Sequence, residues 1–147
     1  VQALLEHLEV NGLVLDCCGS TRDAPSMVLT GYGLHVVTND VDHKLIADSH
    51  MDVTTRDFYD LFSQETRRPD WIVSSPPYQN AFAIWQQALR IVRKGVAFKL
   101  RLNFLEPTKS RGPWLAENYP ELVVVLPRAS YRGRQSFAVE VWFVWWK

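Results

Sequence analysis

One short stretch carries residue types suited to chemistry on an amine. Residues 73–78 read V-S-S-P-P-Y and follow the apolar run D-W-I. Pro76 and Pro77 remove two backbone donors and fix two φ angles, so the segment is stiff and its carbonyl oxygens lack partners within the loop. A nucleobase amine is a poor nucleophile and needs acceptors around it, which Ser75 and Pro76 can supply. The ring of Tyr78 offers a stacking face for an extruded base, worth roughly 1–3 kcal/mol.

Acidic residues end earlier apolar segments of the chain. Asp16 closes L-V-L-D, Asp40 closes L-H-V-V-T-N-D, and Asp48 and Asp52 bracket D-S-H-M-D. A carboxylate after a second strand suits ribose hydroxyls, and a first turn with Gly19 lets a cofactor approach the backbone. Asp48 or Asp52 can accept from the amine of an adenine ring. Each acid is equally compatible with an Asx turn or a helix cap, and the chain has no G-x-G-x-x-G.

Alternating strand and helix patterns must position these residues. The patterns predict strands over residues 13–16, 34–40, 70–74, 95–100, 121–126 and 137–146, and a short strand or turn over 48–52. They predict helices over 1–8, 23–29, 56–64, 80–92 and 112–119. We expect an α/β, Rossmann-like, doubly wound fold with a mostly parallel seven-stranded sheet and an antiparallel C-terminal strand. Ligands of such sheets bind beyond the carboxyl ends of the strands, so the loops after Asp16, Asp40, Ser74 and Leu100 should carry the chemistry.

The motif V-S-S-P-P-Y at a strand end resembles that of the S-adenosylmethionine-dependent DNA amino-methyltransferases, which carry Asp, Asn or Ser, then Pro-Pro, then an aromatic residue. The serine form is similar to the N4-cytosine enzymes, whereas Asp or Asn is more usual in the N6-adenine enzymes. The order of the motifs, without a target-recognition insert, is similar to that of short phage DNA methyltransferases. The resemblance covers nearly all of residues 1–147, so we expect a single methyltransferase domain.

The resemblance implies roles for particular residues. The catalytic residues would be Ser75, Pro76, Pro77 and Tyr78, and S-adenosylmethionine would be bound by Asp16, Cys17, Gly19, Asp40, Asp52 and Ser74. The cofactor loop departs from the family pattern because Gly19 is only three positions after Asp16 and a second glycine is absent. Alternative interpretations are a methyltransferase acting on RNA or a protein amide, and a catalytically inactive module that binds nucleic acid or a partner.

Charge is unevenly distributed, although the formal net charge is zero. Residues 1–98 hold 8 Lys and Arg against 12 Asp and Glu, whereas residues 99–134 hold 7 against 3. A basic segment near S-P-P-Y can grip phosphates beside a target base, which favours DNA as the partner. The alternative is a solvated loop. The candidate nucleic-acid contacts are Arg101, Lys109, Arg111, Arg128, Arg132 and Arg134.

Composition limits the other possibilities. A length of 147 residues with 47% hydrophobic residues suits one domain, and the start at Val1 without methionine indicates a piece of something longer, so a further domain or subunit could supply target recognition. The adjacent Cys17 and Cys18 favour a reducing, intracellular compartment, without separating nucleus from cytoplasm. We expect no metal site, because His43, His50 and the cysteines lack zinc-ligand spacing. No apolar run reaches the length of a membrane span.

Overall fold

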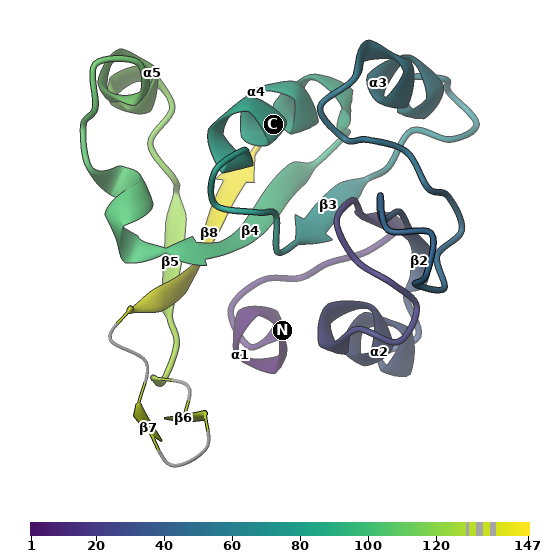
Figure 1. The fold of residues 1–147 in the computed structure, drawn as a ribbon, viewed down its shortest axis with the longest axis horizontal. Coiled ribbons are helices and arrows are strands. Elements are labelled where there is room, and N and C mark those ends of the chain that lie inside the picture. Colours follow the sequence, from purple (N-terminus) through teal and green to yellow (C-terminus); the bar gives the residue numbers. More distant parts are fainter. Residues whose placement is uncertain (129, 132–133, 136–137) are drawn as a thin grey trace.

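The computed structural model describes residues 1–128, 130–131, 134–135 and 138–147. Its main sheet has six strands in the order β2-β1-β3-β4-β8-β5 (Figure 1). Neighbours among β2, β1, β3 and β4 pair in parallel, and β8 is antiparallel to both β4 and β5. The strands are β1 (Leu13–Asp16), β2 (His35–Thr38), β3 (Trp71–Ser74), β4 (Gly95–Arg101), β5 (Leu122–Val125) and β8 (Glu140–Trp146), with β6 (Ser130–Tyr131) and β7 (Arg134–Gln135) as a separate pair.

Helices cover both faces of the sheet, as a doubly wound fold requires (Figure 1). One face carries α1 (Gln2–Leu5) and α2 (Ala24–Gly31). The other carries α3 (Arg56–Phe62), α4 (Ala81–Ile91) and α5 (Arg111–Glu117), and the 3₁₀ helix η1 (Leu102–Leu105) follows β4. The sequence therefore predicted the α/β class, the parallel strands and the antiparallel C-terminal strand correctly.

The apolar run of β8 belongs to the core on both faces. Phe143 and Trp145 pack with the α3–α5 side, whereas Trp142 and Val144 pack with the α1–α2 side. This alternation is that of a central strand whose successive side chains point to opposite faces. At the end of the strand Trp146 is 43% exposed.

The prediction of seven strands in one sheet was wrong. The segment 48–52 forms only an isolated bridge between Asn39 and Ser49. The cause lies in a side chain, because the Asp48 carboxylate accepts hydrogen bonds from the backbone N–H of Thr38 at 2.8 Å and from its hydroxyl at 2.9 Å. The carboxylate thus takes the donor that a continuing strand would have used.

Helix limits also differ from the sequence expectation. The helix predicted over residues 1–8 spans only Gln2–Leu5, and the helix predicted over 80–92 spans Ala81–Ile91. Among the described residues, every helix is too short or too polar to cross a lipid bilayer.

Candidate functional site

The S-P-P-Y corner directly follows the buried strand β3. The Ser75 Oγ atom is buried and, among the described residues, has no hydrogen-bond partner. The Pro76 carbonyl likewise accepts no hydrogen bond within the described part of the chain, whereas the Pro77 carbonyl accepts the Asn80 N–H at 3.0 Å. A buried hydroxyl without a partner carries a desolvation cost, so its presence here favours a site for a ligand.

A pocket of about 420 Å³ lies at the carboxyl ends of the strands, beside this corner. Its volume falls within the roughly 300–1,000 Å³ typical of small-molecule sites. The pocket brings together the loop after β1, the segment after β2 and the S-P-P-Y corner. Five of the predicted site residues line it: Cys17, Asp40, Asp52, Ser75 and Pro77. The lining residues that the sequence did not single out for binding include Cys18, Asn39, Met51, Val53, Thr54 and Asn80.

Asp40 and Asp52 face this pocket with carboxylates that are only partly engaged. One oxygen of Asp40 accepts the Asp42 N–H at 2.8 Å. One oxygen of Asp52 accepts the N–H and the hydroxyl of Thr54, and these bonds lower the pKa of Asp52. Both groups form the Asx-type turns that the sequence left open as an alternative. Each carboxylate still has a second oxygen without a partner among the described residues, and this oxygen can accept a ligand hydroxyl or amine.

Asp16 and Ser74 do not line the pocket but stand behind it. Asp16 is 1% exposed, and its carboxylate accepts the hydroxyls of Ser74 at 2.7 Å and Ser26 at 2.9 Å. Ser74 Oγ in turn accepts the Cys18 N–H at 3.1 Å. Burial raises the pKa of Asp16 to about 6, against the opposing effect of these hydrogen bonds. Both residues, which the sequence analysis assigned to cofactor binding, lie beneath the loop after β1 and fix its shape.

Gly19 is needed because it packs directly on Asp16. A Cβ atom at this position would lie 2.3 Å from an Asp16 carboxylate oxygen, well inside van der Waals contact. The Gly19 N–H donates to the Asn39 carbonyl at 3.0 Å, which ties the first loop to the segment after β2. The single glycine of the shortened loop therefore serves close packing.

The sequence missed Asn39, which organises the floor of the pocket. Its buried side-chain amide donates to the carbonyls of Cys17 and Met51, and its oxygen accepts the Met51 N–H and the Ser49 hydroxyl at 2.8–3.1 Å. These four hydrogen bonds of the side-chain amide join three separate segments of the chain. The signal available in the sequence was a polar residue directly before Asp40, near the end of the segment L-H-V-V-T-N-D.

Cys17 and Cys18 lie side by side in the first loop, with their sulfur atoms 4.0 Å apart. Cys17 is buried, and both residues line the pocket. The neighbouring Cys17 thiol and burial raise the pKa of Cys18. Cys18 is therefore a neutral thiol at this site.

Tyr78 lies on the other side of the corner, 44% exposed. The Arg101 guanidinium lies over its ring at 4.4 Å from the centroid, and its hydroxyl donates to Glu140 at 2.8 Å. Tyr78 lines a second cavity of about 200 Å³ together with Leu100, Arg101, Asn103, Phe104, Glu106 and Arg111. Burial and the bond to Glu140 raise the pKa of Tyr78. Pro77 borders one cavity and Tyr78 the other, so the S-P-P-Y corner separates them.

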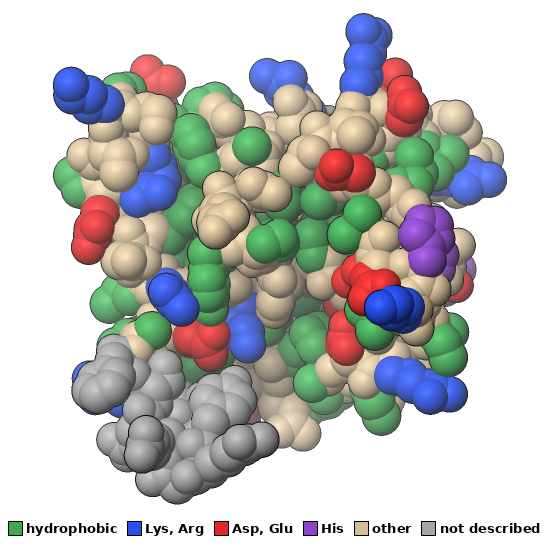
Figure 2. All heavy atoms as spheres, viewed as in Figure 1, with side chains coloured by type: hydrophobic (Ala, Val, Ile, Leu, Met, Phe, Trp, Pro, Cys, Tyr) green, Lys and Arg blue, Asp and Glu red, His purple; other side chains and the backbone are tan. Residues whose placement is uncertain are grey.

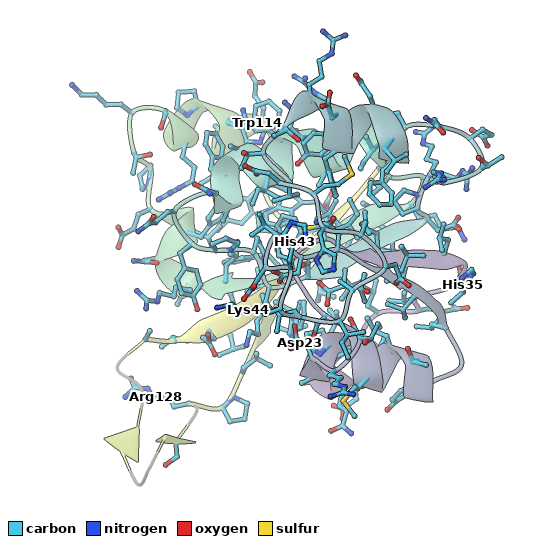
Figure 3. All side chains as sticks on the ribbon, turned by 45° about the vertical axis from the view of Figure 1, so that its right-hand side comes forward. Asp23, His35, His43, Lys44, Trp114 and Arg128 are labelled. Carbon is cyan, nitrogen blue, oxygen red and sulfur yellow. The ribbon has the colours of Figure 1, made fainter. Side chains whose placement is uncertain are left out.

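The predicted nucleic-acid contacts that the structure describes come from the end of β4, from α5 with the loop before it, and from the segment after β5. Arg101 covers Tyr78, and the Arg111 guanidinium donates to the carbonyls of Asn103 and Glu106 and lies over the Phe104 ring. Lys109 is exposed in the loop before α5. Arg128 lies beside β6 and β7, away from the loop that carries His43 (Figure 3). Arg132 and the side chain of Arg134 lie outside what the structure describes.

Acidic and histidine side chains gather over the loops that follow β2, whereas basic side chains are scattered across the same face (Figure 2). The rings of His43 and His50 stack at 4.8 Å, and the His50 ring lies 2.9 Å from the Asp40 carbonyl. Within the described ranges, no group of three or more His, Cys, Asp or Glu side chains is arranged to hold a metal ion.

No family model matches the chain, and no curated protein matches it. Solved structures do match. A methyltransferase from Archaeoglobus fulgidus superimposes with a TM-score of 0.62 at 9% identity, over 99% of this chain and 90% of that one. The fold is that of a methyltransferase. A presumed hemolysin from Lactococcus lactis gives a TM-score of 0.65 at 17% identity, over 99% of this chain and 83% of its own.

A third match is a methyltransferase from Agrobacterium tumefaciens, with a TM-score of 0.60 at 16% identity over 97% of this chain. Here the chain spans only 58% of the matched protein. Both methyltransferases are described as dependent on S-adenosylmethionine. At such low identity these likenesses establish the fold, and the chemistry must be argued from the site itself.

Proposed function

We propose that the chain transfers a methyl group from S-adenosylmethionine to the exocyclic amino group of a base in DNA, with N4 of cytosine ahead of N6 of adenine. One observation carries the proposal: the S-P-P-Y corner stands between two cavities and presents acceptors without partners in the described structure, Ser75 Oγ and the Pro76 carbonyl. A donor pocket on one side and an acceptor cavity on the other is the arrangement that group transfer needs.

The pocket of about 420 Å³ fits the cofactor by size and by its donor set. Asp40, after the second strand, would accept the ribose hydroxyls, and Asp52 would accept the amine of the adenine ring. Cys17 and the backbone of the first loop would border the methionine part, held in place from behind by Asp16. When bound, S-adenosylmethionine supplies a methyl group on a positively charged sulfur, an excellent leaving group.

The residues of the corner would prepare the acceptor amine. Ser75 Oγ and the Pro76 carbonyl would accept hydrogen bonds from its two N–H groups and so turn the nitrogen lone pair away from the ring system. The N–CH₃ bond would form as the S–CH₃ bond breaks, the sulfur would leave as a neutral thioether, and the methylated nitrogen would release one proton to water. Tyr78 would stack on the heterocycle, which holds the amine in line with the donor. The acceptor cavity of about 200 Å³ is smaller than a typical drug-sized site and suits a single ring rather than a whole nucleoside.

The serine form of the motif supports cytosine over adenine through the family resemblance alone. RNA or a protein amide would present a similar planar amine to the same corner. Arg101 and Arg111 already make contacts within the protein, so fewer cations near Tyr78 are available to bind phosphates than the sequence indicated. The acceptor class therefore needs a direct measurement.

The test uses labelled S-adenosylmethionine with DNA, RNA and protein substrates, followed by mass spectrometry of the digested nucleosides and peptides. We expect label in N4-methylcytosine. Label in N6-methyladenine, in RNA or in glutamine would change the proposed acceptor but leave the proposed site unchanged. Undetectable binding of S-adenosylmethionine by calorimetry at millimolar concentration would overturn the proposal in favour of an inactive module.

Two variants separate the two sides of the corner. Asp40→Ala removes a charged acceptor for the ribose and should weaken cofactor binding roughly 10- to 100-fold. Tyr78→Ala should leave cofactor affinity unchanged and raise the acceptor KM roughly 5- to 150-fold. Tyr32→Ala is the matched control, because Tyr32 is 62% exposed at the C-terminal end of α2, at the opposite end of the strands. An equal loss of cofactor affinity in the Tyr78 variant would contradict the assigned roles.

A further inference from the structure

Tyr78 is contacted from two neighbouring strands that lie beyond its own loop. Arg101 ends β4 and Glu140 begins β8, and the two are directly opposite in the antiparallel register. Residues opposite each other in a sheet project from the same face, and so does Lys99, two positions before Arg101. Lys99 Nζ lies 3.7 Å from a Glu140 oxygen. Three charged side chains therefore lie on the sheet face that meets the Tyr78 ring.

The charged pair acts on Tyr78 in two different ways. The Arg101 guanidinium covers one face of the ring, 4.4 Å from its centroid, and Glu140 binds the hydroxyl at 2.8 Å. The first contact fixes the plane of the ring, and the second fixes its direction along the Cβ–hydroxyl axis. Although Arg101 and Glu140 are register partners, the charge of each is turned toward the tyrosine.

These contacts matter because the core does not hold the ring. Tyr78 is 44% exposed and follows two prolines that fix the backbone but leave its side chain to rotate. An exposed aromatic wall stacks well only when it is already in place, since ordering it on binding costs affinity. The side chain of Glu140 is only 25% exposed, so the group that binds the hydroxyl is more buried than the ring itself.

We propose that Arg101 and Glu140 are positioning residues that hold Tyr78 as the stacking wall of the acceptor cavity. This inference rests on the proposed function and deepens it, because it assigns acceptor recognition to two strands outside the S-P-P-Y motif. It also changes the role of Arg101. One face of its guanidinium packs on the Tyr78 ring, and the group does not act as a phosphate contact.

The first test distinguishes a planar support from a phosphate contact. Arg101→Lys keeps the charge but loses the planar guanidinium, and should raise the acceptor KM roughly 2- to 30-fold with kcat and cofactor affinity little changed. The salt dependence of DNA binding should keep its slope. Lys109→Ala is the contrasting variant, since loss of an exposed phosphate contact lowers that slope by about 1.

Two results would overturn this role of Arg101. If Arg101→Lys binds the acceptor normally and Arg101→Ala flattens the salt slope, then Arg101 is a phosphate contact. If both variants bind the acceptor more tightly, then Arg101 occupies the face that the acceptor needs.

The second test is a double-mutant cycle. Tyr78→Phe and Glu140→Ala should each raise the acceptor KM, and the double variant should be no worse than the more damaged single variant, because both remove the same bond. Glu140→Gln keeps an acceptor oxygen and should lose less than Glu140→Ala. Lys99→Gln is the control, since it breaks the Lys99–Glu140 pair but leaves the bond to Tyr78. Additive losses would contradict the proposal.

A third measurement does not depend on methyl transfer. Ultraviolet titration of the phenols, with Tyr78→Phe as the reference, reports the pKa of Tyr78. Glu140→Ala should lower that pKa toward the ordinary value, because the carboxylate that disfavours the phenolate is gone. An unchanged value would overturn the inference even in an active enzyme. A lowered value without any methyl transfer would support the contact and count against the proposed function.

Discussion

The buried carboxyl of Asp16 should make the stability of the protein depend on pH in an unusual direction. Its pKa rises from 3.8 to about 6, mainly through burial. A raised acid pKa means that the folded protein binds the proton more tightly than the unfolded chain does. The contribution of Asp16 to the free energy of unfolding is therefore greatest below pH 3.8, decreases as the pH rises through about 6, and stays constant above that.

The size of this effect follows from the two pKa values. Each pH unit between them is worth about 1.4 kcal/mol, so the decrease attributable to Asp16 amounts to about 3 kcal/mol. Asp16→Asn cannot ionise and lacks this contribution. The difference in free energy of unfolding between the wild-type protein and Asp16→Asn should therefore change by about 2 kcal/mol, against the wild type, between about pH 4 and pH 7.

Urea unfolding followed by tryptophan fluorescence over this pH range measures the difference. Asp70→Asn is the contrasting variant, because burial of Asp70 is outweighed by the Leu13 N–H and Lys94, which bring its pKa below the ordinary value. Asp70 therefore contributes stability that is lost as the pH falls through the acid range, with the opposite sign. Parallel curves for the wild type and Asp16→Asn would refute the reasoning, since Asp16 would then titrate as in the unfolded chain.

Three further changes test the packing behind the site. Gly19→Ala places a methyl group against Asp16 and should lower the free energy of unfolding by about 1–3 kcal/mol in urea titration. Asn39→Ala removes the partners of a buried carbonyl, a partly buried carbonyl and a backbone N–H, and should destabilise the protein by about 3–5 kcal/mol, with loss of cofactor binding in calorimetry. Trp145→Phe should lower the melting temperature more than Trp142→Phe, because the Trp145 indole donates to Asn118, whereas the Trp142 indole has no partner among the described residues.

Much of the fold could be predicted from the sequence because local patterns and tertiary environment agree. The apolar runs that became β1, β3, β4 and β8 are continuous, and only strands buried on both faces need that pattern. The antiparallel end of the sheet also followed from the two consecutive C-terminal strands. The strand expected over residues 48–52 did not form, because the backbone pairing of this segment depends on where the Asp48 side chain binds. Hydrophobic periodicity does not encode that position.

The site was predictable as far as strand ends determine it. Asp40, Ser75 and Pro77 line one pocket because the carboxyl ends of neighbouring parallel strands meet at one edge. Asp52 also lines it, although the segment 48–52 is not a strand of the sheet. The division between residues that line the pocket and residues that support it was not predictable. In the sequence Asp16 and Asp40 both close an apolar segment, but in the structure Asp16 ends β1 and is buried against Ser26 and Ser74, whereas Asp40 lies two residues beyond β2.

The support of Tyr78 was beyond the reach of sequence reasoning. Glu140 lies 62 positions from Tyr78, and the register of β4 with β8 alone brings it opposite Arg101. Residues 99–134 are indeed basic in composition. Composition does not reveal that guanidinium groups turn toward a ring or a carbonyl in their own protein.

The strand order has a consequence for synthesis of the chain on the ribosome. The residues of the donor pocket lie between Cys17 and Asn80, so they are available well before β8 emerges. β8 lies between β4 and β5 and carries Glu140, so neither β5 nor the tyrosine wall can be secured until it inserts. Because Phe143 and Trp145 of β8 share one core cluster with Ile72 and Ile84, and domains generally fold as units, we expect the domain to complete its folding only after its last strand has left the ribosome.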